Sequence, residues 1–129
     1  GALGQRFSHQ SPGLLLIEAM NEFRATLMHT SFGDQTQFFH RKTAMDHGVL
    51  TGQPLMEDVE MSDRLNALGE TVYVAVPNRV SAKKWMTGHY WKRFLTVIEF
   101  CLRYRLLAYT REQRYALSCT FYERYYRQR

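Results

Sequence analysis

Two adjacent carboxylates, Glu57 and Asp58, are the clearest candidates for chemistry in this sequence. They follow Pro54 and precede a segment with helical spacing, so they would lie in the first turn of a helix. The helix dipole favours negative charge at that end, which keeps such carboxylates ionised. An ionised carboxylate can take a proton from a hydroxyl as a general base. Helices also commonly begin with acidic residues, so plain helix-terminal charge remains an alternative.

A polar triplet, Gly33-Asp34-Gln35, separates a predicted helix from a short aromatic segment. A polar loop at the edge of a strand can bind sugar hydroxyls. The same triplet can be an ordinary turn, because Gly-Asp pairs punctuate loops.

A basic cluster follows a β-branched segment later in the chain. Cations on a loop after a strand suit a diphosphate, and a tryptophan beside them could stack on a ring. A solvated basic loop is the alternative interpretation. The residues concerned are Arg79, Lys83, Lys84 and Trp85.

Composition limits the classes of protein to consider. The chain has 129 residues, of which 45% are hydrophobic, so we expect one folded domain rather than a disordered chain. Two cysteines, Cys101 and Cys119, exclude a disulfide framework and a four-cysteine zinc site, and the five histidines lack metal-binding spacing. No signal peptide and no apolar run of the ~20 residues needed to cross a membrane is visible. We therefore expect a cytoplasmic protein. The chain begins with Gly1 rather than Met, so we also expect it to be a processed, tagged or excised piece.

Charge is divided unevenly along the chain. Residues 1–78 carry a net charge of −4, and residues 79–129 carry +9. A basic half suggests an anionic partner such as phosphate, nucleic acid or a lipid surface. No nucleic-acid-binding motif accompanies the charge, so we do not expect a nucleic-acid partner.

The hydrophobic spacing predicts a mixed α/β protein with many helices and few strands. Such a small sheet exposes its edges unless it pairs with something else, so the chain looks like part of a larger sheet. Residues 1–13 are predicted to be a loop or a short strand. The next elements are a helix at 14–28, on which Leu16, Met20, Phe23 and Leu27 recur with helical spacing, a strand at 36–41, a helical turn at 42–47 and a helix to Leu68. They are followed by a strand at 71–76, a basic loop at 78–88, an amphipathic helix at 90–109 and a last helix to about 126.

Taken in order, these motifs resemble one family. The chain is similar to the C-terminal half of a bacterial family-2 glycosyltransferase of the GT-A fold, over roughly residues 1–95. The matching segments are Gly33-Asp34-Gln35, Phe38-Phe39-His40-Arg41, Pro54-Leu55-Met56-Glu57-Asp58-Val59-Glu60, Arg64-Leu65, Gly69 and Ser81-Ala82-Lys83-Lys84-Trp85.

The resemblance implies a role for each motif. Asp58, with Glu57 beside it, would be the base toward the acceptor hydroxyl. Lysine replaces the family's arginine at position 84, which removes the forked contact that arginine makes with phosphate. The implied acceptor-binding residues are Gly33, Asp34, Gln35 and Trp85, and the implied donor-diphosphate ligands are Lys84, Lys83 and Arg79.

The resemblance also implies what this chain lacks. In the family, an N-terminal half binds the nucleotide and ends in an Asp-x-Asp motif that holds a divalent metal. We therefore expect a helix-rich C-terminal half of a GT-A-like domain with a small mixed sheet. Residues 1–88 would be the acceptor-side half and residues 89–129 a basic amphipathic helical tail. Mg²⁺ or Mn²⁺ is expected in the intact enzyme only, and this chain alone would bind none.

The expected function is the acceptor-side part of an inverting glycosyltransferase that moves a sugar from a nucleotide sugar to a hydroxyl. Partners would be the missing half or a second copy, and the tail could touch the inner membrane face. The alternative is a non-catalytic basic module that binds a membrane surface or a partner protein. The tail pattern that favours this alternative, arginines opposite an apolar stripe, is also typical of ordinary core helices.

Overall fold

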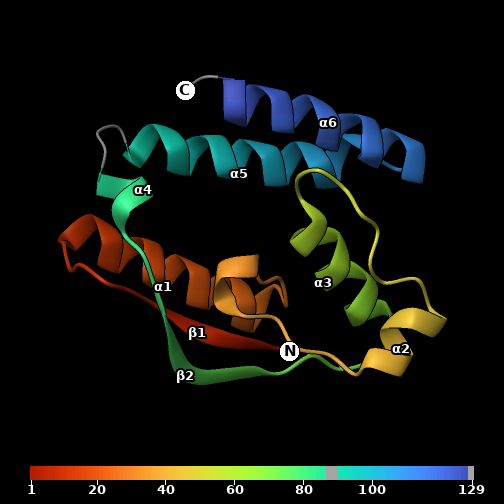
Figure 1. Ribbon diagram of the computed structural model, residues 1–129, viewed down its shortest axis with the longest axis horizontal. Coiled ribbons are helices and arrows are strands. Elements are labelled where there is room, and N and C mark those ends of the chain that lie inside the picture. Colours follow the sequence, from red (N-terminus) through yellow and green to blue (C-terminus); the bar gives the residue numbers. More distant parts are fainter. Residues whose placement is uncertain (87–89, 128–129) are drawn as a thin grey trace.

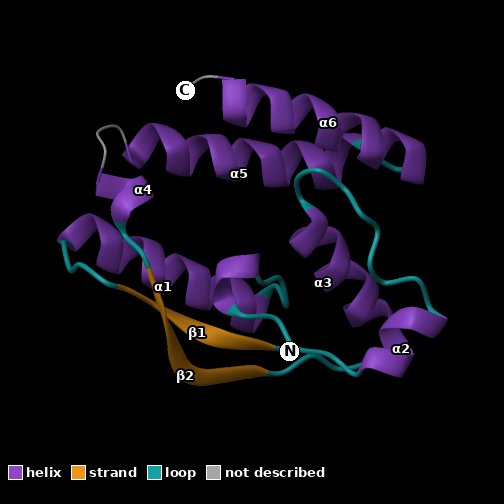
Figure 2. Cartoon of the chain, viewed as in Figure 1, coloured by secondary structure: helices purple, strands orange, loops and turns teal. Residues whose placement is uncertain are grey.

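The computed structural model describes residues 1–86 and 90–127, the side chains of Lys84 and Arg127 excepted, and it is a mixed α/β structure (Figure 1). The chain runs β1 (Ala2–Phe7), α1 (Pro12–Leu27), the 3₁₀ turn η1 (Gly33–Gln35), α2 (Arg41–Asp46), α3 (Glu57–Leu68), β2 (Tyr73–Val80), α4 (Lys83–Met86), α5 (Tyr90–Leu107) and α6 (Arg111–Arg127). Helix predominates over strand, as the sequence predicts (Figure 2).

The sheet consists of two parallel strands, so the prediction of a mixed sheet is corrected. The paired residues run from Ala2 opposite Tyr73 to Phe7 opposite Val80. The predicted strand at residues 36–41 is wrong: that segment contributes only one antiparallel bridge, between Ala2 and Gln37.

The backbone explains why the strand at residues 36–41 does not form. Thr36 has a positive φ of 49°, which interrupts an extended chain. His40 accepts a hydrogen bond from the Thr43 backbone nitrogen and thereby caps α2, which begins at Arg41.

Helix α1 begins as the sequence predicts but buries a different face from its apolar stripe. Ser11 accepts a hydrogen bond from the Leu14 nitrogen, and Pro12 occupies the first turn. Glu18 and Asn21 face the sheet: Glu18 Oε1 accepts from the Phe7 nitrogen at 2.6 Å, and Asn21 Nδ2 donates to the Gln5 side chain at 2.8 Å. The residues with helical spacing are instead 39–65% exposed, namely Leu16, Met20, Phe23 and Leu27.

Strand β2 is longer than predicted, so the prediction of a basic loop at residues 78–88 is partly wrong. The strand continues past Pro77 to Val80, as proline permits where no ladder hydrogen bond is needed. Asn78 then donates to Thr36 Oγ1 at 2.7 Å, and α4 begins at Lys83. Residues 87–89 lie outside the described residues.

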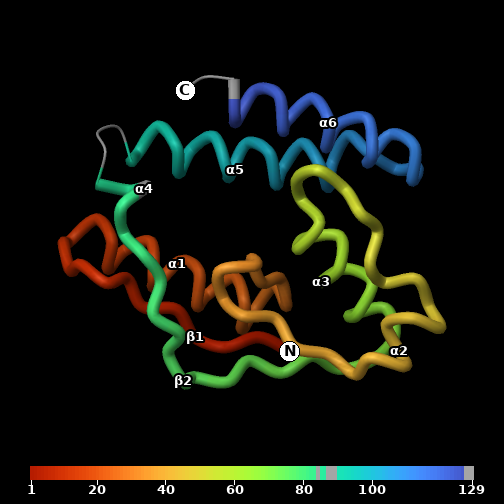
Figure 3. The backbone as a smooth tube through the Cα atoms, viewed as in Figure 1, coloured from red at the N-terminus to blue at the C-terminus, as the bar shows by residue number. Residues whose placement is uncertain are grey.

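Helices α5 and α6 share a hydrophobic core with α3. The buried members of that core are Met56, Val59, Phe100, Tyr104 and Phe121, and the rings of Phe100 and Phe121 stack at 4.3 Å. In Figure 3, α5 and α6 run along one side of the molecule and the two strands along the other, with α1 between them. None of the helices in the described ranges is long and apolar enough to cross a membrane.

Candidate functional site

The Asp58 carboxylate is held in place by two backbone hydrogen bonds. Its Oδ2 accepts from the Gly33 nitrogen at 2.9 Å, and its Oδ1 accepts from the Val59 nitrogen at 2.8 Å. The residue before the pair, Met56, has a positive φ of 63°, a conformation that costs energy for a side chain with a Cβ. Glu57 is exposed, so the fold distinguishes the two adjacent carboxylates and turns only Asp58 toward η1.

Burial raises the pKa of Asp58, although the hydrogen bonds from Gly33 and Val59 and the charge of Arg24 oppose the rise. The sequence predicted that the helix dipole would keep the Asp58 carboxylate ionised. Burial acts in the opposite direction, because it favours the protonated form. A base works best when its pKa lies near the working pH. The raised pKa therefore brings Asp58 closer to the range useful for proton transfer at neutral pH.

Asp34 is a second carboxylate on the same side of the site. Its Oδ2 accepts from Gln5 Nε2 at 3.0 Å, while its buried Oδ1 has no hydrogen-bond partner among the described residues. Burial raises the pKa of Asp34, and the negative charge of Asp58 raises it further. A buried acceptor without a donor costs free energy, and because solvent does not reach this oxygen, a ligand in the cavity does not contact it in this arrangement.

Arg24 is a functional candidate that the sequence analysis missed. Its guanidinium lies 3.4 Å from the centre of the Phe32 ring and donates to Gln35 Oε1 at 2.9 Å. Burial lowers the pKa of Arg24 to about 10, while the charges of Asp34 and Asp58 oppose the fall, so the group is cationic at neutral pH. The one available signal was its place among the apolar positions of α1, directly after Phe23.

Gln35 holds the turn together from inside. Its side chain is fully buried, and its Oε1 accepts from the Phe32 nitrogen at 3.1 Å as well as from Arg24. These contacts fix the turn that presents Gly33 to Asp58. Direct contact between Gln35 and an acceptor stays a prediction.

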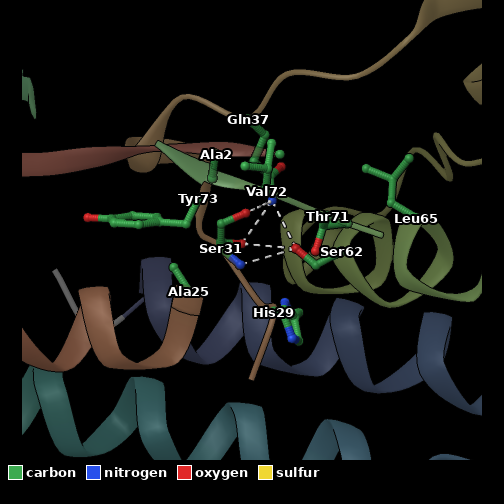
Figure 4. A pocket seen from close by; sticks show the side chains of 11 residues that line it. Ala2, Ala25, His29, Ser31, Gln37, Ser62, Leu65, Thr71, Val72 and Tyr73 are labelled. Carbon is green, nitrogen blue, oxygen red and sulfur yellow. Dashed lines mark hydrogen bonds between the residues drawn. The ribbon is translucent and has the colours of Figure 1, made fainter. Parts of the chain in front are cut away.

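A polar junction ties the segment around η1 to α3, as Figure 4 shows. Gln37 Nε2 lies 2.9 Å from Ser31 Oγ, 3.0 Å from Ser62 Oγ and 3.1 Å from the Asp58 carbonyl oxygen. The Ser31 nitrogen also donates to Ser62 Oγ at 3.2 Å. The backbone of the Asp58 turn is thus bound to the same segment that carries Gly33.

Glu60, two residues after Asp58, binds the C-terminal helices to α3. Its carboxylate pairs with Arg64 at 2.8 Å and with Arg114 of α6 at 2.6 Å. The Tyr104 hydroxyl of α5 lies 2.9 Å from Glu60 Oε2 and 2.7 Å from Gln53 Oε1. Burial raises the pKa of Glu60, but the hydrogen bonds from Arg114, Arg64 and Tyr104 outweigh it and the net shift is downward.

Four of the predicted site residues line one cavity of about 690 Å³: Gly33, Asp34, Asp58 and Trp85. The rest of its wall comes mainly from apolar side chains of α1 and α5. Trp85 reaches it from α4, where its ring also packs edge-on against Phe7 at 5.9 Å.

Two of the predicted diphosphate ligands, Arg79 and Lys83, are not brought to this cavity. Arg79, on β2, and Lys83, on α4, are exposed and are not among its lining residues. The side chain of Lys84 lies outside the described part of the chain. A donor contact by these three residues stays a prediction.

Residues 1–86 and 90–127 hold no group of three or more histidine, cysteine, aspartate or glutamate side chains placed to bind a metal ion. The divalent metal that the family resemblance implies would be held outside this chain, so its binding in the intact enzyme stays a prediction.

Comparison with protein-family models, curated proteins and solved structures finds no match to this chain. The resemblance to a glycosyltransferase therefore remains a hypothesis that depends on the motifs themselves.

Proposed function

We propose that this chain is the acceptor-side part of an inverting glycosyltransferase and that Asp58 is its general base. The observation that carries the proposal is the placement of the Asp58 carboxylate, which two backbone N–H groups hold at a cavity wall while burial raises its pKa. The order of the family-like motifs adds support, because Gly33, Asp58 and Trp85 line the same cavity.

In the proposed reaction, Asp58 takes the proton of an acceptor hydroxyl. The hydroxyl oxygen then forms a bond to the anomeric carbon of the donor sugar, from the face opposite the diphosphate. The bond between that carbon and the diphosphate oxygen breaks, and the nucleoside diphosphate leaves with the electron pair. The configuration at the anomeric carbon is inverted.

Under this proposal, polypeptide outside this chain binds the nucleotide and any divalent metal. We place the reaction in the cytoplasm, including the inner membrane face. The alternative of a basic membrane-binding module has less support, because Arg105, Arg114 and Arg124 form ion pairs with carboxylates of the same chain.

The proposal is tested with the protein that contains both this chain and the nucleotide-binding portion. The protein is incubated with a panel of nucleotide sugars and hydroxyl acceptors, and products are identified by mass spectrometry and NMR. We expect a glycoside of inverted anomeric configuration together with free nucleoside diphosphate. A product of retained configuration, or no transfer from any donor, would contradict the proposal.

A further inference from the structure

The cavity beside Asp58 is large for a protein of this size and mostly apolar. It measures about 690 Å³ and is open to solvent on one side, since Met20 and Phe23, which line it, are 39% and 59% exposed. That volume is within the range of about 300–1,000 Å³ typical of small-molecule sites. The apolar wall comes chiefly from α1 and α5; it includes Ile17, Met20, Phe94, Val97, Ile98 and Cys101.

Polar groups on the cavity wall are few and belong to the proposed catalytic site. Asp34, Asp58 and Arg24 all line the cavity, and together they carry two negative charges and one positive charge when ionised. Arg24 is already engaged by Gln35 and by the Thr30 carbonyl oxygen at 3.1 Å. An anionic head group would therefore meet net negative charge, whereas a hydroxyl could donate a hydrogen bond to the Asp58 carboxylate.

From this distribution we infer that the acceptor is a neutral amphiphile, a hydroxyl compound whose apolar body lies between α1 and α5 while its hydroxyl reaches Asp58. As a statement about the acceptor this rests on the proposed function, but binding of such a compound can be measured without any sugar donor. The apolar wall supplies affinity, and the carboxylates select a head group that donates hydrogen bonds and carries no negative charge.

The two cysteines provide an internal comparison for the test. Cys101 lines the cavity, whereas Cys119, on α6, is not among its lining residues. Both thiols are free. Burial raises the pKa of Cys101 to about 11, so its alkylation is slow and any further protection must be measured as a ratio of rates.

The experiment is alkylation of the chain by N-ethylmaleimide with and without 1-decanol, with both cysteine-containing peptides quantified by mass spectrometry. We expect decanol to slow alkylation of Cys101 at least fivefold and to leave Cys119 unchanged. Among shorter alcohols, the concentration needed for half-maximal protection of Cys101 should rise about fourfold for each methylene removed. Decyl phosphate should protect at least tenfold less well.

Two charge variants on α5 serve as a matched pair. Val97→Asp places a charge on the cavity wall and should abolish protection by decanol, whereas Leu95→Asp, at a position 62% exposed, should preserve it. Circular dichroism checks that both variants fold. The head-group comparison on the unchanged chain tests the inference even if Val97→Asp unfolds.

Two results with added compounds would overturn the inference: no protection of Cys101 by any alcohol, or equal protection by decyl phosphate. A third would be protection of Cys101 that rises with protein concentration when no decanol is present. That result would mean that a second copy of the chain fills the cavity. The proposed function fails separately. If sugar transfer proceeds to a small polar acceptor while decanol does not bind, the glycosyltransferase proposal stands and the amphiphile does not. If decanol binds and no transfer occurs, only the proposed function fails.

Discussion

The Gly33 backbone nitrogen donates a 2.9 Å hydrogen bond to Asp58 Oδ2 across 25 positions of sequence. This contact joins the two motifs that the sequence analysis singled out for different roles, a polar turn and an acidic helix start. It also fixes the orientation of a carboxylate whose pKa burial raises. A positioned carboxylate of raised pKa is a suitable general base, so this single contact carries much of the proposed mechanism.

The raised pKa of Asp58 predicts a particular dependence of stability on pH. The folded state holds the Asp58 proton more tightly than the unfolded state, so this group's contribution to stability is lost as pH rises through the folded pKa. Asp58→Asn cannot titrate. The free energy of unfolding of the unchanged chain, minus that of the variant, should therefore fall as pH rises from about 3.8, the ordinary pKa, toward neutrality. Urea unfolding across that range measures the difference, and a difference that rises with pH would contradict the shift.

Glu60 should behave in the opposite sense. Its folded pKa lies below the ordinary value of 4.5, so its ion pairs stabilise the chain above that pH and their contribution is lost as pH falls through the folded pKa. The difference in unfolding free energy between the unchanged chain and Glu60→Gln should increase as pH rises. A difference that does not vary with pH would mean that Glu60 does not hold α6 to α3 through its charge.

Tyr104→Phe tests the same junction without changing charge. The variant removes the Tyr104 hydroxyl, which lies within hydrogen-bond distance of Gln53 Oε1 and Glu60 Oε2 in a buried position. Because buried acceptors then lose a donor, we expect the unfolding free energy to fall by about 1–3 kcal/mol. Tyr109→Phe is the control, because that ring is 84% exposed and its change should cost almost nothing. Similar losses for both variants would exclude the buried hydrogen bonds as the cause.

The exposed ends of the α1 apolar stripe, Leu16 and Leu27, do not line the cavity beside Asp58 and predict self-association away from it. Leu16 and Leu27 are 47% and 65% exposed on this helix. An uncovered apolar face of this kind favours contact with a second surface. Sedimentation should therefore show concentration-dependent dimers or larger species. Leu16→Glu with Leu27→Glu should shift the chain toward monomer, whereas Thr26→Glu on the same helix should not. A monomer at all concentrations of the unchanged chain would show that this face needs no cover.

Local sequence signals predicted the regular elements well and the connections poorly. Ser11 and Pro12 placed the start of α1, and the β-branched segment before Pro77 correctly indicated β2. The predicted strand at residues 36–41 failed because the left-handed backbone of Thr36 is set by tertiary contacts such as that from Asn78. Helix periodicity predicted α1 but not its buried face, since Glu18 and Asn21 are drawn inward by partners on β1.

The candidate site could be predicted only in part for the same reason. Asp58, Asp34 and Trp85 stand in recognisable motifs, and the fold places them on one cavity wall. Arg24 belongs to no motif: its importance comes from Phe32 and Gln35, which lie beside it only after folding. The unpartnered Oδ1 of Asp34 is likewise a property of packing, which no spacing of residue types reveals.

The most direct test of the central claim compares Asp58→Asn with Glu57→Gln in the protein that, under the proposal, also contains a nucleotide-binding portion. Steady-state kinetics with varied donor separate proton transfer from donor binding. We predict that Asp58→Asn lowers kcat about 10²–10⁴-fold with little change in the donor KM, because that is the usual contribution of a general base. Glu57→Gln, at an exposed position, should cost far less. Equal and small effects of the two changes would contradict the account and leave Asp58 as ordinary helix-terminal charge.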